Sequence, residues 1–248
     1  MKILYDNKIT NATLTVSSEN PDYTFSSGFN DTRLSRKART TATSGQYILM
    51  DFGTPIDVDY IGLLGSNISS GAVVFASGGS TSGTTSVSTT LTDYETYIGN
   101  FSSTQSYRYW RVDIDDPDNT NTYIEIGQLY IGTALEMPPM PRGGQELPLM
   151  TTSTFAKSTG GQLYGDERLL YREAKIAFAD AIMNNYKPLI DAFFREVQTI
   201  KPFILLVWEN DLDEINPIYC HLTTPLEWKK YNGEDILWNL SLEFSEVF

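Results

Sequence analysis

Cysteine and histidine are almost absent from this 248-residue sequence, which holds one of each, Cys220 and His221. A single cysteine excludes a disulfide within the chain and a metal cluster made of cysteines alone. One histidine is too few for the usual zinc sites built from several histidines. The two residues are neighbours in a strand-like segment, so their side chains point to opposite faces and cannot form a nucleophile–base pair. We therefore expect structural roles for both.

Positive charge and long apolar runs are also scarce. The chain has 18 Lys and Arg against 31 Asp and Glu, a net charge of −13. Nucleic-acid binding depends on Lys and Arg that neutralise phosphates, so no nucleic-acid partner is expected. No apolar run approaches the length of a membrane span, and the N-terminus MKILYDNKIT lacks the apolar core of a signal peptide. Neither membrane insertion nor signal-directed secretion is expected.

Catalytic and nucleotide-binding signatures are missing as well. The sequence has no Gly-Lys-Ser/Thr phosphate loop and no Gly-x-Ser-x-Gly elbow. We therefore expect a protein that is not an enzyme. Hydrophobic residues make up 41% of the chain and aromatic residues 12%, enough for a real core. The length suits one large domain or two ordinary ones.

The stretch Tyr107–Gly132 predicts two strands around a polar loop. Trp110, Val112 and Ile114 alternate with polar neighbours, which is the period of a half-buried strand. The second run, around Ile124 and Ile126, has a mixed alternation that indicates cover on both faces. We expect a β-hairpin or its near equivalent, inside a sandwich or barrel.

These two strands carry a first resemblance. An aromatic-Trp-Arg strand, a loop and a closing Ile-Gly-Gln-Leu-Tyr strand resemble the last strands of the discoidin-like, galactose-binding-like jelly roll. Upstream, Gln46–Gly53 and Ile56–Gly65 resemble the paired strands of that family, joined by an Asp-aromatic-Gly turn. The resemblance covers residues 1–135 and implies a jelly-roll β-sandwich there.

The same family sometimes holds a structural calcium ion in an early loop, which residues 25–34 resemble. Oxygen ligands for it would be Asp22, Asn30, Asp31 and the distant Glu125. The usual Asp-Gly…Thr spacing is absent, and Asn/Asp loops also form plain turns. We expect no cofactor and no metal, with structural calcium as the one alternative.

Lectin-like relatives bind sugar through loops at one end of the sandwich. Corresponding loops here are Asp22–Arg39, the Gly- and Ser-rich Ser66–Thr92 and Asp115–Thr122. Ser66–Thr92 also fits a tolerated, flexible surface insertion. Aromatic side chains that would stack on a sugar ring are Tyr94, Tyr97, Tyr107 and Tyr109.

Residues 136–162 predict a linker or extended arm, because proline and glycine cluster there. Such an arm would space or strap two bodies, or pair with a neighbouring subunit. After it, the pattern predicts a second mainly β domain over 163–248 with one helix, Asn184–Thr199. Its predicted strands are Arg168–Asp180, Lys201–Trp208, Ile218–Thr223 and Asp235–Glu246.

This order of strand, helix, buried strand, acidic turn and closing strands resembles the β-sandwich-plus-helix core of bacteriophage tail tube, distal tail and baseplate proteins. Lys201-Pro202-Phe203 and the closing WNLSLEF are the motifs that carry it. The resemblance implies a homo-oligomeric ring among other phage tail proteins, located in the virion and made in the host cytoplasm. Interface candidates are the large apolar residues Phe193, Phe194, Trp238 and Phe244.

Acidic residues form two clusters, Glu209–Glu214 and Asp113–Asp118. Both fit acidic turns, with calcium binding or acid–base chemistry as the alternative. The sequence therefore leaves two functions open. The first, which the sequence favours, is a structural subunit of a phage tail tip. The second is a carbohydrate-binding module that recognises a glycan of the host surface.

Overall fold

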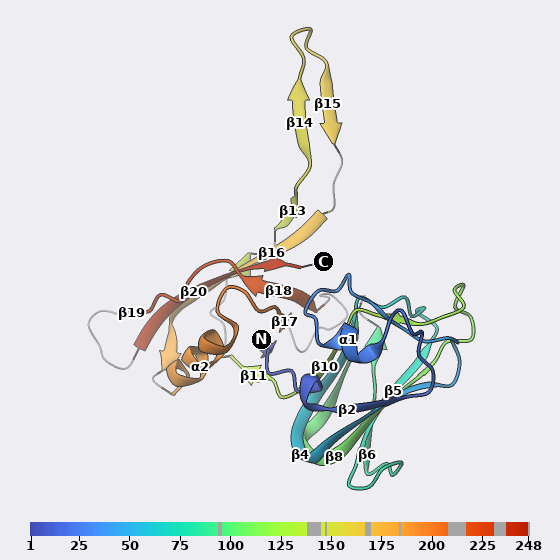
Figure 1. Ribbon diagram of the computed structural model, residues 1–248. Helices are drawn as coiled ribbons and strands as arrows, with labels where there is room; N and C mark the ends of the chain where they lie inside the picture. Colours follow the sequence, from blue (N-terminus) through green and yellow to red (C-terminus); the bar gives the residue numbers. More distant parts are fainter. Residues whose placement is uncertain are drawn as a thin grey trace. The chain divides into compact units, whose positions relative to one another are not determined.

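The computed structural model describes residues 1–93, 96–137, 145–146, 148–166, 170–183, 185–207, 217–230 and 237–247. They form two compact units. The first unit comprises Met1–Glu136 and Phe203–Tyr219, and the second comprises Met137–Pro202 and Cys220–Val247. Strands dominate both (Figure 1). The mainly β class expected from the sequence is confirmed.

A seven-stranded sheet makes up most of the first unit. Its main path runs β10-β4-β8-β5-β6, with β2 on β4 and β7 on β8. The strands are β2 (Thr13–Val16), β4 (Gln46–Leu64), β5 (Val73–Gly79), β6 (Val87–Thr90), β7 (Thr92–Asp93), β8 (Tyr97–Asp115) and β10 (Gln128–Gly132). The long strands β4 and β8 pair antiparallel with register shifts near their middles, so the sheet folds over into a sandwich.

The core of this sandwich lies between the two halves of β4 and β8. Ile48 and Met50 face it from the first half of β4, and Ile61 and Leu63 from the second. Trp110 is fully buried among them, and its ring meets that of Phe101 edge-on at 5.4 Å. Alternation of buried and half-buried residues leaves the opposite face of these strands open.

Two predicted pairings in this unit are wrong. β8 and β10, expected as a hairpin, do not pair; β10 pairs with β4, which lies between them. The segments Gln46–Gly53 and Ile56–Gly65, expected as paired strands, are one continuous strand, β4. Gly53 has a φ of 72°, and its N–H donates to Asp51 Oδ1 at 2.8 Å. This local kink bends the strand without reversing it.

The low-complexity stretch Ser66–Thr92 is more ordered than a flexible insertion. After β5, which pairs with β8, its Gly- and Ser-rich part contains β6, which pairs with β5. Gly78 in β5 faces Trp110, because an added Cβ would lie 2.8 Å from the indole ring. Part of this glycine content therefore reflects packing against a large core residue.

Smaller elements complete the first unit. They are β1 (Lys2–Leu4), η1 (Ile9–Asn11), α1 (Phe25–Phe29), β3 (Ala38–Arg39), β9 (Glu125–Ile126), β11 (Leu135–Glu136) and β17 (Phe203–Leu206). β3 pairs with β9, and β1 pairs with both β11 and β17. The expected division at 135/136 is close to the observed one, but a strand from the C-terminal half joins the first unit.

The second unit contains a sheet built on two long strands, β16 (Leu170–Met183) and β20 (Leu237–Glu246). β20 also pairs with β18 (Ile218–Leu222) and β19 (Lys229–Lys230), and β16 with β12 (Gln145–Glu146) and β13 (Leu149–Thr151). The helix α2 (Lys187–Val197) has a proline in its first turn, as expected. The predicted helix and the predicted strands of this half are confirmed.

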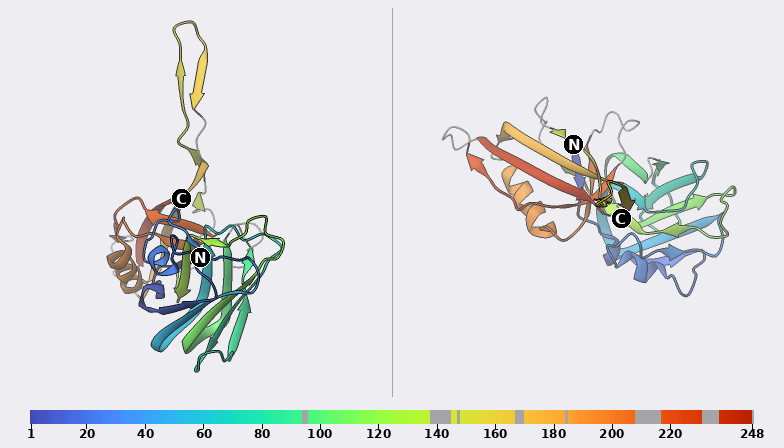
Figure 2. Two further views of the ribbon diagram at one scale, coloured as in Figure 1. Left: turned by 45° about the vertical axis from the view of Figure 1, so that its right-hand side comes forward. Right: turned by 90° about the horizontal axis from the view of Figure 1, so that it is seen from above.

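Much of the predicted linker is strand. β12 and β13 lie in it and pair with β16. Beyond β13, β14 (Thr154–Lys157) and β15 (Leu163–Asp166) pair with each other. We call these two strands and their turn, residues 158–162, the arm; it stands away from the sheet of its own unit (Figure 1, Figure 2).

The interface candidates fall into two groups. Phe193 and Phe244 are 0% and 1% exposed, so they belong to the core of the second unit and not to a surface. Phe194 and Trp238 are half-buried. Trp238 lies edge-on to Trp228 at 6.2 Å and next to Lys187 and Lys230. Packing within the chain therefore accounts for most of these large side chains.

Two further expectations concern an acidic cluster and membrane-spanning helices. The acidic cluster Glu209–Glu214 lies outside the described residues. A helix long and apolar enough to cross a membrane is not found among the residues that are described.

Candidate functional site

The outer face of the sandwich carries a regular array of nine residues on three neighbouring strands. The array follows from the register, which places Tyr47, Asp113 and Phe75 in one row, Leu49, Arg111 and Ser77 in the next, and Asp51, Tyr109 and Gly79 in the third. Because alternate residues point to the same face, the side chains in these rows all point away from the core. None of the array residues on β4 and β8 is fully buried.

Arg111 lies at the centre of the array. Its guanidinium lies 4.1 Å from the centre of the Tyr47 ring and donates to both carboxylate oxygens of Asp113, at 2.5 to 2.9 Å. The hydrogen bond to Asp113 raises the pKa of Arg111. The stacking and the ion pair hold the planar donor group in one orientation while its side chain stays 37% exposed.

A second arginine fixes the adjacent row. Arg108 donates to Asp51 through Nε at 2.7 Å and Nη2 at 2.8 Å, and its guanidinium lies 4.7 Å from the Tyr109 ring centre. These hydrogen bonds, together with the one from the Gly53 N–H, lower the pKa of Asp51 from 3.8 to about 2. Asp51 is therefore ionised, and Tyr109 is held from one side.

The turn between β5 and β6 forms a wall beside the array. Thr84 closes it, with its N–H donating to the Thr81 carbonyl at 3.1 Å and its hydroxyl to the same oxygen at 2.7 Å. An added Cβ on Gly79 would lie 2.1 Å from the Thr84 carbonyl oxygen, so only glycine allows the turn to approach so closely. Between turn and sheet lies a hollow of about 170 Å³.

We call this the outer-face hollow. Its lining residues are Leu49, Ser77, Gly83, Thr84, Thr85, Tyr109, Trp110, Arg111 and Asp113. They combine an aromatic ring, a guanidinium that donates, a carboxylate that accepts and several hydroxyl groups that do both. Such a set matches a small ligand with an apolar ring face and several hydroxyl groups at its edge.

The four tyrosines proposed to stack on a sugar have different fates. Tyr109 lines the outer-face hollow. Tyr107 packs edge-on against the core residue Trp110. Tyr97 is 3% exposed, with its hydroxyl donating to the Ser69 carbonyl at 2.5 Å, and Tyr94 lies outside the described residues. The sequence predicted binding in the end loops and missed this site, although strand alternation in YRYWRVDID places Tyr109, Arg111 and Asp113 on one face.

The loops expected to bind sugar are tied to one another. Asp116 is fully buried and accepts from the Ser69 N–H at 2.9 Å, from the Ser69 hydroxyl and from Asn119 Nδ2 at 2.7 Å. Asn67 donates to the Tyr123 carbonyl at 3.1 Å. The polar groups of Ser66–Thr92 and Asp115–Thr122 that meet here are thus used in holding the two loops together.

The four calcium candidates are not gathered into one site. Asp31 is paired with Arg33 and Arg36, and the hydrogen bonds of Arg33 hold its pKa well below its usual value. Glu125 is paired with Arg39 at 2.5 Å. Asp22 and Asn30 are exposed. No group of three or more acidic, His or Cys side chains suited to a metal is found among the described residues; structural calcium stays a prediction.

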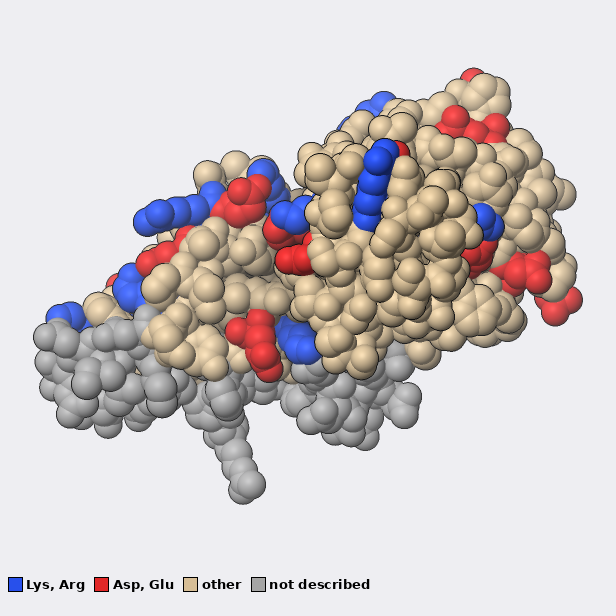
Figure 3. All heavy atoms as spheres, turned by 90° about the horizontal axis from the view of Figure 1, so that it is seen from below, with Lys and Arg blue, Asp and Glu red and all other residues tan. Residues whose placement is uncertain are grey.

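Cys220 and His221 lie in β18, as expected for strand residues. Cys220 is fully buried, which raises the pKa of its thiol well above the usual value. His221 is half-buried. On the face that Figure 3 shows, most Lys and Arg side chains lie beside Asp or Glu, and its described residues form no broad basic area.

Comparison with known proteins gives structural likeness only. A scan against protein-family models finds no match, and a search of curated proteins finds none. Among solved structures, the lectin domain of lectinolysin complexed with Lewis B antigen is similar, at 12% identity and a TM-score of 0.41, over 51% of this chain and 96% of that one.

Two further structures are similar to the same extent. The family 32 carbohydrate-binding module of C. perfringens NanJ, in complex with galactose, has 13% identity and a TM-score of 0.41, over 53% of this chain and 98% of that one. A Streptococcus pneumoniae fucose-binding module has 10% identity and a TM-score of 0.42, over 52% and 95%. Values this low support no inference about what this chain binds.

Proposed function

We propose that the first unit is a carbohydrate-binding module and that the outer-face hollow receives one sugar residue of a glycan. The observation that carries the proposal is the alignment of Tyr109, Arg111 and Asp113 along one face of β8, at a hollow of about 170 Å³. Binding of a sugar needs no catalytic residue.

The chemistry of the lining supports a sugar over an apolar ligand. A sugar hydroxyl both donates and accepts, so it pairs with the Asp113 carboxylate and the Arg111 guanidinium together. The C–H face of a pyranose ring suits the Tyr109 ring. The side chains of Arg111 and Asp113 are already held by Tyr47 and by each other. Little conformational entropy is therefore lost when a ligand binds.

The test is a glycan array with the full chain, followed by calorimetry with the best ligand. Tyr109→Ala, Arg111→Ala and Asp113→Asn should each weaken affinity by about tenfold or more, because each removes one type of contact. Arg36→Ala, an exposed arginine away from the hollow, is the matched control. Absence of binding to any glycan at millimolar concentration, or equal affinity of all four variants, contradicts the proposal.

A second candidate is a structural subunit of a multi-copy assembly, of the phage-tail type that the sequence resembles. The observation that favours it is the arm, whose two strands have no other strand partner among the described residues. Isolated two-stranded hairpins are marginally stable in water at best. Leu149 and Leu170, at the base of the arm, are 63% and 56% exposed. An assembly would cover the edges of the arm and these two leucines. The oligomeric state in solution tests this candidate.

A further inference from the structure

The sheet of the second unit has an opening in it. β18 pairs with β20 as far as Leu222 opposite Phe244, and pairing resumes with β19 at Lys229 opposite Asn239. Between these points, the six residues 223–228 run beside only four residues of β20, 240–243. The longer segment must leave the plane of the sheet, as in a large bulge.

The opening leaves backbone groups of β20 facing outward. The Thr223 N–H donates to the Glu243 carbonyl at 2.9 Å, so the polar groups of Glu243 point to this side. In a strand, residues two apart point their N–H and C=O the same way. The N–H and C=O of Ser241 therefore face the opening, where the described residues provide no strand opposite them. Such groups need water or a ligand as partner.

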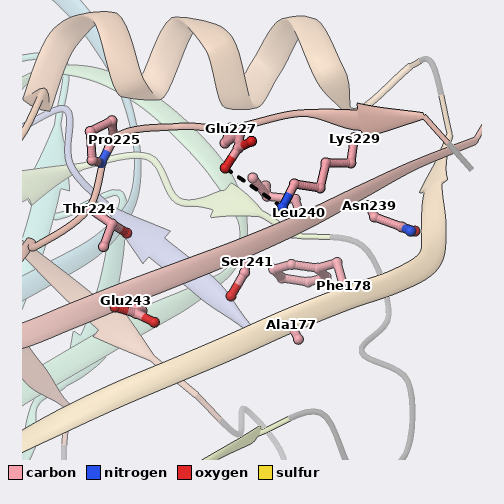
Figure 4. Close-up of a pocket in the computed structure, with 10 residues that line it drawn as sticks. All are labelled: Ala177, Phe178, Thr224, Pro225, Glu227, Lys229, Asn239, Leu240, Ser241 and Glu243. Carbon is pink, nitrogen blue, oxygen red and sulfur yellow. Dashed lines mark ion pairs between the residues drawn. The ribbon is translucent and has the colours of Figure 1, made fainter.

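A hollow of about 330 Å³ lies at this opening, and we call it the edge hollow. Phe178 and Leu240 lie on the sheet side of it, Thr224, Pro225 and Glu227 come from the displaced segment, and Lys229 comes from β19 (Figure 4). Asn239, Ser241 and Glu243 add to the lining from β20, and Ala177 adds to it from β16. Glu227 and Lys229 are 3.8 Å apart. Glu243 is paired closely with Lys175, at 2.8 Å, so Glu227 is the carboxylate with the looser ion pair.

The arm has complementary properties. Its turn is held by the Ser158 N–H donating to the Gln162 carbonyl at 2.8 Å and the Gly161 N–H to the Ser158 carbonyl at 2.9 Å. The tip, Ser-Thr-Gly-Gly, is small enough to enter a narrow opening. No hydrogen bond of the described residues uses the backbone of Thr159 or Gly160. Lys157, next to the turn, is exposed.

On the basis of the structural-subunit candidate above, we propose that the arm of one copy inserts its tip into the edge hollow of a second copy. The tip backbone forms hydrogen bonds with the N–H and C=O of Ser241, and Lys157 approaches Glu227. The contact is head-to-tail, since arm and hollow are different surfaces. Contacts of this type close into rings or extend into filaments.

The first measurement is the mass of the full chain by light scattering over a range of concentrations. Two variants follow. In the tip variant, residues 158–162 are replaced by an Asn-Gly turn, which shortens the arm. In the hollow variant, Ser241→Trp fills the edge hollow. Ser245→Trp, on the same face of β20 but outside the hollow, is the matched control. Circular dichroism checks that each variant folds, and Glu227→Lys replaces Ser241→Trp if that variant does not fold.

The proposal predicts an oligomer for the unmodified chain and for Ser245→Trp, and at least about tenfold weaker association for the tip and hollow variants. When mixed, these two should form a one-to-one dimer, because one supplies an intact arm and the other an intact hollow. Association unchanged in both variants, or no dimer on mixing, overturns this docking but leaves the structural candidate. A monomer at every concentration overturns both.

Discussion

Three arginines of the first unit share one arrangement at the residue scale. Arg39, Arg108 and Arg111 each stack on a tyrosine and pair with a carboxylate. Arginine suits this use because its planar guanidinium stacks through its face and bonds through its edge. Two of these arginines organise the outer-face hollow. The third, Arg39, lies between Tyr23 and Tyr123 and joins β3 to β9.

Replacing Arg39 tests how much such a junction stabilises the fold. Arg39→Ala removes both ring contacts and leaves Glu125, 19% exposed, without its partner. We expect a lower midpoint in urea unfolding, because a half-buried carboxylate loses its counter-charge. Arg36→Ala, at an exposed ion pair, should change the free energy of unfolding by no more than about 0.5 kcal/mol. Equal midpoints for the two variants would contradict the role of Arg39.

Asp51 makes the stability of the folded chain depend on pH in the acid range. Its pKa is lowered from 3.8 to about 2 in the folded chain, chiefly by Arg108. A depressed pKa contributes stability that is fully present above the unfolded value and is lost as pH falls through the folded one. Asp51→Asn should therefore flatten the fall in unfolding midpoint between pH 4 and 2. An unchanged slope over this window, measured by fluorescence, would refute the assignment.

At the element scale, the two long strands β4 and β8 organise the first unit. Their alternation is readable in the sequence, and it correctly divides Trp110 and Val112 from Tyr109 and Arg111. Their pairing is not readable, because local periodicity contains no information on which strand lies next in the sheet. The expected β8–β10 hairpin failed for this reason.

Gly79 links the β5–β6 turn to the outer-face hollow. Gly79→Ala would bring a Cβ to within 2.1 Å of the Thr84 carbonyl oxygen, so the turn must move. We expect a loss of about 1–3 kcal/mol in stability and weaker glycan binding by calorimetry. Gly71→Ala, where the new methyl meets nothing within 4 Å, is the control. Full glycan affinity in Gly79→Ala would show that the turn is no part of the site.

The helix α2 tests the distinction between core and interface. Phe193 is 0% exposed and Leu189, on the same helix, is 49% exposed. Phe193→Ala should cost about 3–5 kcal/mol in thermal or urea unfolding, and Leu189→Ala no more than about 0.5 kcal/mol. If Phe193→Ala changed only the oligomeric state and left stability intact, the interface role predicted from the sequence would return.

At the scale of the whole molecule, the first unit depends on a distant segment. β1 pairs with β17, so Ile3 and Leu4 are buried with help from residues 203–206. A fragment of residues 1–136 lacks β17 and exposes these two side chains and the edge of β1.

We expect the 1–136 fragment to aggregate or to melt at a lower temperature than the full chain. A fragment of residues 5–132 lacks both β1 and β17, so no strand edge is left without its partner there, and it should be more soluble. Light scattering and thermal unfolding decide this. Equal solubility and equal melting temperatures for both fragments would mean that β17 adds nothing to the first unit.

The sequence by itself determined what depends on local pattern and composition. Alternation and helical spacing identified β16, β20, α2 and segments of β4 and β8, and the scarcity of cysteine and histidine limited the chemistry. Only the tertiary structure decided which strands are neighbours, that β17 belongs to the first unit, and that Phe193 is core. It also created both hollows. Each forms where strands far apart in the sequence meet, and no local pattern encodes that contact.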